Sequence, residues 1–411
     1  MPYLSPNEPL TLAELASLLR SQEAVRLSPE AEQTLAAAPL LAEPEFVAAS
    51  PAQWSAGLLT ALAAGTGPEL PAALVRRMLL LAAHRLGRTG GAAALPTVRR
   101  LLDFYSREVW PLVYEQGSLG AGNDQIPLAH LALPLAGLSE VNYQGYRLAA
   151  ADVLGLFGWE PPQLAPALAL VLLNGSDFTL AHATEALERA EHLLRAADAV
   201  GSLAATGAAS ASSPDLLADA RRAIETACNA AAPAPTSLAE LLPATTVHTL
   251  ALDRALAQLT QVVAQMGAQS AQRTAELVAQ PDLTAAPEQQ FGLLALPRAA
   301  ASLVQRCGSW AIASNASDTH SALCGAAAAQ EANRVVELAE QLVGLELLAA
   351  AQALDEREQA EGDLGRPLSP TLLRAVAAFR EHVTFAAHDR VLAPDLHRAA
   401  RFMREYAWAQ E

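Results

Sequence analysis

The sequence has 411 residues, of which 52% are hydrophobic but only 5% aromatic, and its apolar residues are mostly alanine and leucine. Because β-sheets are enriched in aromatic and β-branched residues, this composition disfavours sheet folds and favours helices. The net charge is −16, from 43 acidic and 27 basic residues, and every basic residue is arginine. Such a surface repels phosphate backbones, so we expect no binding to nucleic acid.

Signals for helix starts recur along the chain. Thr11 with Glu14 forms a capping-box pattern, and Ser28 and Ser369 each precede a proline at the first helical position. With these signals, the spacing of apolar residues predicts helices over 11–20, 29–38, 51–64, 71–87, 95–109, 163–173, 178–200, 214–229, 244–278, 291–306, 325–358, 369–384 and 393–408. We therefore predict an all-α fold.

The longest predicted helix, 325–358, is apolar on most of its faces. Leu338, Leu342 and Leu345 recur at steps of three or four residues, and Val343 widens this stripe. A helix that is apolar on most sides is usually buried. At about 1.5 Å per residue it would be roughly 50 Å long, which exceeds the core of one compact subunit. This predicts a spine helix that is packed within a homo-oligomer.

Cysteine spacing and hydropathy predict a soluble, cytoplasmic protein. The three cysteines are odd in number and widely spaced, which is not typical of a disulfide framework. The N-terminal residues lack the basic and then apolar pattern of a signal peptide. No apolar run reaches the roughly 18 residues of a membrane span, so we expect no association with a membrane.

The histidines and the glycine-rich turn do not by themselves indicate a site. The nine histidines show no metal-ligand spacing, so we expect no metal. His130 lies in the apolar run 126–131, where a hydrogen-bonded core histidine is the simplest interpretation. The turn at 117–122 lacks the glycine order of a dinucleotide-binding loop, and no predicted strand precedes it.

Three parts of the sequence resemble the histidine and aromatic amino acid ammonia-lyases. The turn 117–124 reads GSLGAGND and is followed by PLAHLAL at 127–133, which is similar to the signature of that family. The segment LLNGS at 172–176 resembles the family's Leu-Leu-Asn-Gly-Thr stretch. The segment LELLAAAQALD at 345–355 resembles the family's C-terminal spine helix.

The resemblance implies an all-α, long-helix bundle of the ammonia-lyase (L-aspartase-like) type, assembled as a homotetramer whose pockets draw on several subunits. That implication agrees with the spine helix inferred from periodicity. The expected organisation is an N-terminal helical region at 1–110, the signature turn and pocket helices at 111–200, a flexible connection and loop at 201–243, a central long-helix bundle at 244–358 and a C-terminal helical segment at 359–411.

The turn departs from the family at the residues that make its electrophile. Family members build methylidene-imidazolone from a consecutive Ala-Ser-Gly. The third residue's backbone nitrogen attacks the first residue's carbonyl, and the serine then loses water to give an exocyclic C=C. Here the triad is Ala121, Gly122 and Asn123, and Gly122 has neither a β-carbon nor a hydroxyl to lose. We therefore expect no methylidene-imidazolone and no other cofactor.

Other positions that the resemblance assigns to the pocket are also changed. The family's loop with its catalytic tyrosine has no counterpart, because no tyrosine occurs between Leu41 and Leu58. Leu62 takes the position that often selects the substrate ring. Glu240 takes the position of an arginine that binds the substrate carboxylate, and an acidic side chain there repels a carboxylate. Pro297 takes the position of a second tyrosine.

A few pocket positions are retained. Asn174 occupies an active-site position of the family, although an asparagine directly after the predicted helix 163–173 is also typical of a structural cap. Asp124 closes the turn and belongs to the same pocket. Asp318 and His320 lie near the family's Gln-Glu-Asp-His segment, where they form either an acid–base pair or a capped loop before the spine helix.

Three functional hypotheses follow. The first is a lyase homologue without catalysis, which serves as a structural or regulatory partner, pairs with a related lyase-family subunit, or binds a small aromatic ligand. The second is an enzyme that uses the same pocket for acid–base elimination, isomerisation or dehydration, with Asp318 and His320 as catalytic candidates. The third is an ammonia-lyase that works by another route.

Overall fold

The computed structural model describes residues 2–21, 23–44, 50–118, 124–204, 214–230, 235, 247–280, 291–314, 325–361 and 368–408. The chain forms two compact units, and each is assembled from three separate stretches. Unit 1 consists of Met1–Glu185, Arg221–Ala255 and Leu323–Gln330. Unit 2 consists of Ala186–Ala220, Leu256–Ala322 and Glu331–Glu411.

The predicted all-α fold is confirmed, and the predicted helices are present within a few residues. The helices that match predictions are α1 (Leu12–Arg20), α2 (Pro29–Ala36), α3 (Pro51–Leu62), α4 (Ala72–Thr89), α5 (Leu95–Ser106), α8 (Pro166–Leu173), α9 (Asp177–Ala204), α10 (Pro214–Cys228), α12 (Val247–Val278), α14 (Leu296–Ser314), α15 (Ala326–Glu361), α16 (Pro370–His382) and α17 (Ala393–Glu405). Thr11 forms the predicted capping box with Glu14, and the hydroxyls of Ser28 and Ser369 accept hydrogen bonds from the first turns of their helices.

The largest error in a helix boundary concerns α14. The predicted range was 291–306, but the helix begins at Leu296 and ends at Ser314. Gly292 adopts a positive φ of 52°, and the Asp389 carboxylate accepts the backbone N–H groups of Phe291 and Gly292. These contacts hold a turn ahead of the helix, and Pro297 then occupies its first turn, where proline is well tolerated.

Short elements in unit 1 were missed by the sequence analysis. They are α6 (Gln125–Ala132), α7 (Ala150–Phe157), the 3₁₀ turns η1 (Ala92–Ala94) and η2 (Leu133–Ala136), and the strands β1 (Tyr3–Leu4), β2 (Arg26–Leu27), β3 (Thr66–Glu69), β4 (Val109–Pro111), β5 (Tyr114–Gln116), β6 (Glu140–Tyr143) and β7 (Tyr146–Ala149). β1 pairs with β2 in parallel. The other pairs are antiparallel: β3 with β5, β4 with β6, and β6 with β7.

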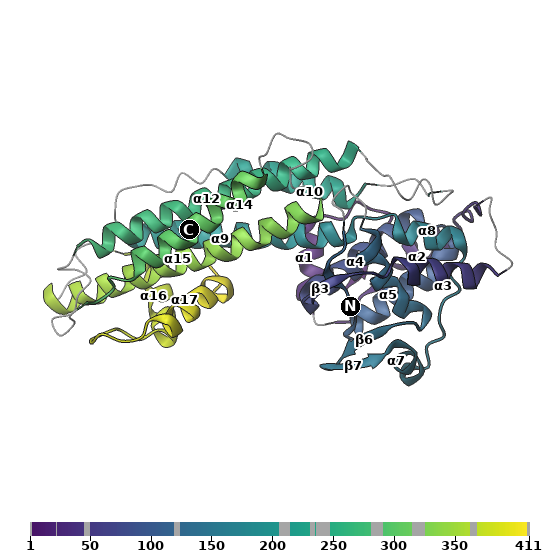
Figure 1. The fold of residues 1–411 in the computed structure, drawn as a ribbon, viewed down its shortest axis with the longest axis horizontal. Helices are drawn as coiled ribbons and strands as arrows, with labels where there is room; N and C mark the ends of the chain where they lie inside the picture. Colours follow the sequence, from purple (N-terminus) through teal and green to yellow (C-terminus); the bar gives the residue numbers. More distant parts are fainter. Residues whose placement is uncertain are drawn as a thin grey trace. The chain divides into compact units, whose positions relative to one another are not determined.

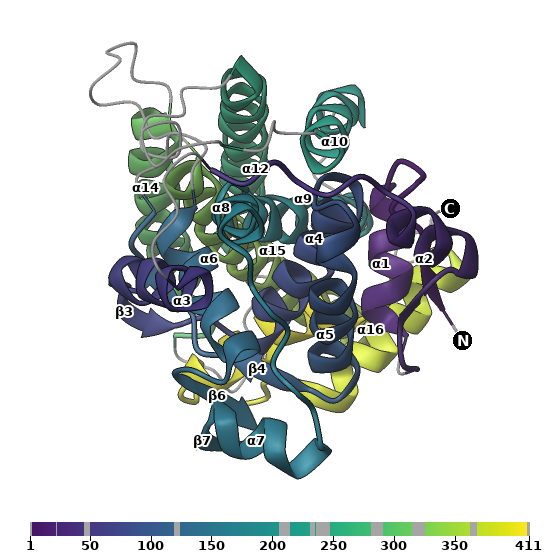
Figure 2. The same ribbon diagram turned by 90° about the vertical axis from the view of Figure 1, so that its right-hand side faces the viewer.

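The β6–β7 hairpin has a clear local cause. Its two-residue loop, Gln144 and Gly145, has φ angles of 53° and 82°, as a tight hairpin turn requires. In unit 1, α4 packs against α5, α1 and α2, and the hairpin lies beside α7 (Figure 2). The buried side chains of α4 and α5 form the centre of this unit.

Unit 2 is built on long helices, with α15 at its centre and α9 and α12 alongside it (Figure 1). Glu340 of α15 accepts hydrogen bonds from Arg189 of α9 and Arg404 of α17. Glu346 of α15 accepts two from Arg273 of α12, and both of these side chains are buried.

The spine helix is buried within its own chain. Leu338, Leu342, Val343 and Leu345 are each at most 5% exposed in the single chain. The prediction of a buried helix is therefore confirmed, whereas its packing within a homo-oligomer stays a prediction. The other helices of the same chain already cover it, so its apolar faces leave the oligomeric state open. Among the helices of the described part of the chain, none combines the length and the hydropathy that a membrane span needs.

Candidate functional site

The structure describes three of the predicted site residues: Leu62, Asp124 and Asn174. The remaining predicted site residues lie outside the described residues; they are Ala121, Gly122, Asn123, Glu240, Asp318 and His320. The described residues are therefore those that flank the predicted pocket in the sequence.

Asp124, where the signature turn ends, is enclosed by protein. Its side chain is completely buried and accepts hydrogen bonds from the Ser118 hydroxyl at 2.8 Å, the Thr179 hydroxyl at 2.9 Å and the Thr179 backbone N–H at 2.8 Å. Burial raises the pKa of Asp124 to about 6, although the hydrogen bonds from Thr179 and Ser118 oppose this shift. Asp124 thus joins Ser118 to the start of α9.

Asn174 directly follows α8 and is half-buried. Its backbone N–H donates to the Leu170 carbonyl at 3.0 Å, as the C-cap of a helix does. The structural-cap interpretation of Asn174 is therefore supported for its backbone. Its role in a pocket concerns its side chain and stays a prediction.

Arg85, which the sequence analysis did not select, supports the segment around Asn174. Its Nε and Nη2 donate to the Asp177 carboxylate at distances of 2.7 to 3.1 Å. Its Nη1 donates to the Val171 carbonyl at 2.7 Å, and its Nη2 donates to the Leu172 carbonyl at 3.1 Å. The guanidinium thus joins the end of α8 to the first turn of α9. The sequence signal was an arginine, next to His84, within a buried part of α4 that is otherwise apolar.

His130 supports the segment that follows Leu62. Leu62 is half-buried at the end of α3, and the backbone N–H of Gly65 donates to His130 Nε2 at 3.0 Å. His130 is buried, and burial lowers its pKa. Because Nε2 accepts the hydrogen bond from Gly65, a proton on the neutral ring lies on Nδ1. A β-carbon on Gly65 would lie 3.0 Å from His130 and 3.1 Å from Tyr114. The prediction of a hydrogen-bonded core histidine is confirmed.

Two further buried groups in unit 1 are held in their neutral forms. Burial lowers the pKa of His84 to about 4, although its Nε2 hydrogen-bonds to the Asn229 side chain at 3.1 Å. Burial raises the pKa of the Cys228 thiol to about 12, so it is not an activated nucleophile. Among the described residues, no group of three histidine, cysteine or acidic side chains could hold a metal ion.

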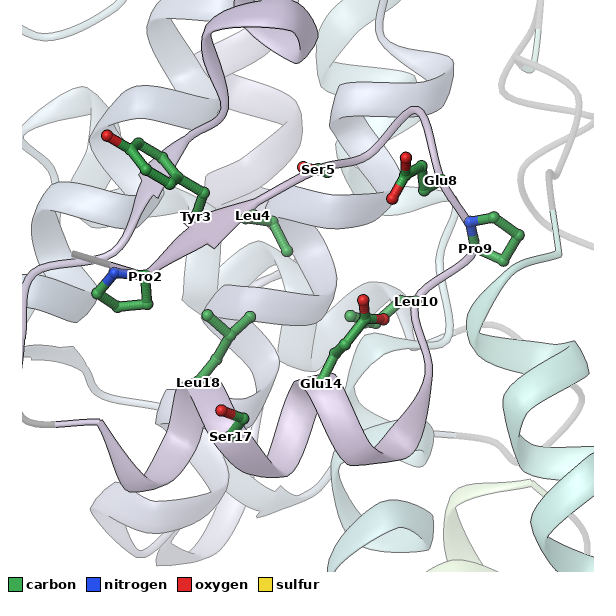
Figure 3. Close-up of a pocket in the computed structure, with 10 residues that line it drawn as sticks. All are labelled: Pro2, Tyr3, Leu4, Ser5, Glu8, Pro9, Leu10, Glu14, Ser17 and Leu18. Atoms are coloured by element: carbon green, nitrogen blue, oxygen red, sulfur yellow. The ribbon is translucent and has the colours of Figure 1, made fainter.

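A cavity of about 270 Å³ lies between the N-terminal segment and α1 (Figure 3). Leu4, Leu10 and Leu18 form its apolar part, and Glu8 and Glu14 contribute carboxylates. None of the predicted site residues lines it. Glu14 already forms the capping box with Thr11, which accounts for its position.

Comparison of the sequence identifies relatives along almost its whole length. The family model described as aromatic amino acid lyase matches residues 40–214 and 207–381. Histidine ammonia-lyase from Symbiobacterium thermophilum is 30% identical over 492 aligned positions, which cover 96% of this chain and 95% of that protein. The alignment is longer than the 411 residues of this chain, so it includes positions at which this chain has no residue.

Solved structures share the fold. Histidine ammonia-lyase from Trypanosoma cruzi superposes with a TM-score of 0.80 at 22% identity, covering 98% of this chain and 93% of that chain. Tyrosine aminomutase from Streptomyces globisporus gives a TM-score of 0.80 at 18% identity, covering 98% of this chain and 97% of that chain. The family match, the relative aligned over its full length and the shared fold together show that this chain belongs to the aromatic amino acid lyase family.

Proposed function

We propose that this chain is a member of the aromatic amino acid lyase family that does not release ammonia and that acts as a small-ligand-binding, structural or regulatory protein. The observation that carries this proposal is Gly122 at the position of the serine from which relatives form methylidene-imidazolone. Glycine has no β-carbon and no hydroxyl, so the exocyclic C=C cannot form. The residues of this chain do not fit the prosthetic group, whatever the conformation of the turn.

The buried hydrogen bonds near the predicted pocket favour a ligand-binding site over a pocket that has collapsed and lost its function. Asp124, Arg85 and His130 each bury a polar side chain in order to hold a loop of this region. Buried polar groups are costly unless they are hydrogen-bonded, so these contacts stabilise one defined loop arrangement. Such preorganisation is what a binding site needs. Glu240 in place of a carboxylate-binding arginine favours an aromatic amine over an aromatic amino acid.

The test combines mass spectrometry with binding. Forming the electrophile removes two water molecules per chain, so we expect the intact mass to equal that of the unmodified sequence. Phe, Tyr and His should yield no cinnamate-type or urocanate-type product. Thermal-shift titration should show tighter binding of phenethylamine, tyramine or histamine than of the matched amino acids. Product formation that a dehydroalanine-trapping nucleophile abolishes would contradict the proposal.

The binding experiment also distinguishes a binding protein from the second candidate function, an enzyme that works without the electrophile. An enzyme that used Asp318 and His320 as an acid–base pair would convert a bound compound, whereas a binding protein would return it unchanged. Asn174 supplies the same amide in both cases. Conversion that is lost on Asp318→Asn would favour elimination, isomerisation or dehydration without the electrophile.

We also propose that the chain is a homo-oligomer, most simply a tetramer with twofold axes. The basis is family membership together with the low fraction of charged residues, 17%, which leaves few charges to oppose an interface. Light scattering at micromolar concentration should return about four chain masses. A monomeric mass would contradict the proposal, and a mixed assembly that forms only with an active lyase would support a role as a regulatory subunit.

A further inference from the structure

We propose that Arg85 is a positioning residue that fixes Asn174 against the end of the signature turn, so that the pocket wall is set by a guanidinium buried behind it. This proposal rests on the proposed ligand-binding function for its effect on affinity. It rests on the structure alone for its effect on the loop.

The contacts of Arg85 are specific to the shape of a guanidinium. All three of its nitrogens donate, and they satisfy the Asp177 carboxylate and the carbonyls of Val171 and Leu172 at the same time. A fourth, longer contact of 3.4 Å joins Nη1 to the carbonyl of Asn174 itself. The Arg85 and Asp177 side chains are 10% and 1% exposed. Lysine carries a single nitrogen and cannot span these acceptors.

These contacts provide hydrogen-bond donors for carbonyl groups at the C-terminal end of α8. Every residue of α8 is buried, so the last carbonyls of this helix cannot be satisfied by bulk water. Arg85 supplies donors to two of those carbonyls and to the one that follows at Asn174. Removing the guanidinium would take away the donor to the Leu172 carbonyl and leave the Val171 carbonyl with only the Asn174 N–H at 3.2 Å.

Gly175 is fitted to Arg85. A β-carbon at this position would lie 2.5 Å from Nε, 2.6 Å from Cζ and 2.7 Å from Nη2 of Arg85. Contacts this short require the guanidinium or the loop to move. The glycine therefore allows the backbone directly after Asn174 to lie against the guanidinium. Arg85 and Gly175 therefore act together to position this loop, although they are distant in the sequence.

Asp124, at the end of the signature turn, also holds the loop after Asn174. The backbone N–H of Asp124 donates to the Gly175 carbonyl at 3.2 Å. The Asp124 carboxylate in turn binds Thr179 in the first turn of α9, close to Asp177. Asn174 and Gly175 are thus held between Arg85 and Asp124. A change at Arg85 should reach both the side chain of Asn174 and the end of the turn.

The experiment uses the full chain and compares Arg85→Ala with the control Arg99→Ala. Arg99 is an exposed arginine that pairs with Glu32 and has no contact with the loop. Hydrogen exchange of peptides covering 170–180 should accelerate in Arg85→Ala and stay unchanged in the control. Phenethylamine, used as the probe, should bind roughly tenfold more weakly to Arg85→Ala. Millimolar guanidinium should restore both properties, whereas equal concentrations of ammonium or urea should not.

Gly175→Ala provides a second route that keeps the arginine and the charge. It should accelerate exchange in the same peptides, and guanidinium should not rescue it, because the site is still filled. If Arg85→Ala does not fold, Arg85→Lys and Gly175→Ala carry the test with the same exchange measurement. Unchanged exchange at 170–180 in these variants would overturn the proposal. Failure of the wild-type protein to bind phenethylamine would instead count against the proposed ligand, while the exchange and rescue results still decide the role of Arg85.

Discussion

The double variant Gly122→Ser with Asn123→Gly should not deaminate Phe, Tyr or His, even though it restores the sequence Ala-Ser-Gly. The absorbance of the electrophile can return without activity, because other groups are also missing. No tyrosine occurs between Leu41 and Leu58, and Glu240 stands in place of an arginine. General acid–base catalysis is worth about 10²- to 10⁴-fold, so its loss together with substrate anchoring places ammonia release below detection.

The matched control is Gly122→Ala with Asn123→Gly, which adds a β-carbon but no hydroxyl. It can gain neither the absorbance nor activity, so it separates the electrophile from a change in loop shape. Both variants should remain folded, because Ser118 and Asp124 hold the ends of the turn and the substitutions lie between them. Ammonia release from the serine variant above that of the alanine control would show that the pocket is still a lyase pocket.

Arg273→Met should destabilise the protein by about 3–5 kcal/mol, as is typical when one member of a buried ion pair is removed. The side chains of Arg273 and Glu346 are 4% and 0% exposed, and their contacts are 2.5 and 2.9 Å long. Burial raises the pKa of Glu346, and Arg273 opposes that shift. Without Arg273, the folded state binds a proton more tightly than the unfolded state, so the loss should be larger at about pH 8 than at about pH 5.

Urea unfolding monitored by circular dichroism provides the measurement, with two comparison variants. Arg189→Met should cost less, because Glu340 keeps its bond to Arg404. The double variant Arg273→Met with Glu346→Leu should recover most of the loss, since no buried charge is then left without a partner. The Ser270 side chain also hydrogen-bonds to Glu346. A loss below about 1 kcal/mol in Arg273→Met would mean that Ser270 or water satisfies Glu346 without the arginine.

The helices were predictable because the signals that specify them lie close together in the sequence. Caps at Thr11, Ser28 and Ser369, followed by apolar residues at helical spacing, placed most helices within a few residues. The short strands were missed because their pairing depends on partners distant in the sequence. β4, for example, pairs with β6 across about thirty residues. The spine helix was predicted to be buried, but periodicity cannot say whether the same chain or another one covers it.

The site was predictable only where a resemblance named it. Asn174, Asp124 and Gly122 were selected through segments similar to the lyases, and their motifs lie in continuous stretches. Arg85 carries no motif, and its partners at 171–177 are far along the chain. Nothing in the sequence shows that position 175 needs a glycine because an arginine of another helix packs against its backbone. Such tertiary hydrogen bonds are visible only once the fold brings the two segments together.

The division into two units also bears on how the chain is made. Four of the five boundaries between the units fall inside helices, in α9, α10, α12 and α15, so each of these helices contributes residues to both units. During synthesis, unit 1 stays incomplete until residue 330 has left the ribosome, by which time much of unit 2 has already emerged. Unit 1 therefore cannot form from an N-terminal fragment alone, and no single cut in the gene yields either unit as a fragment.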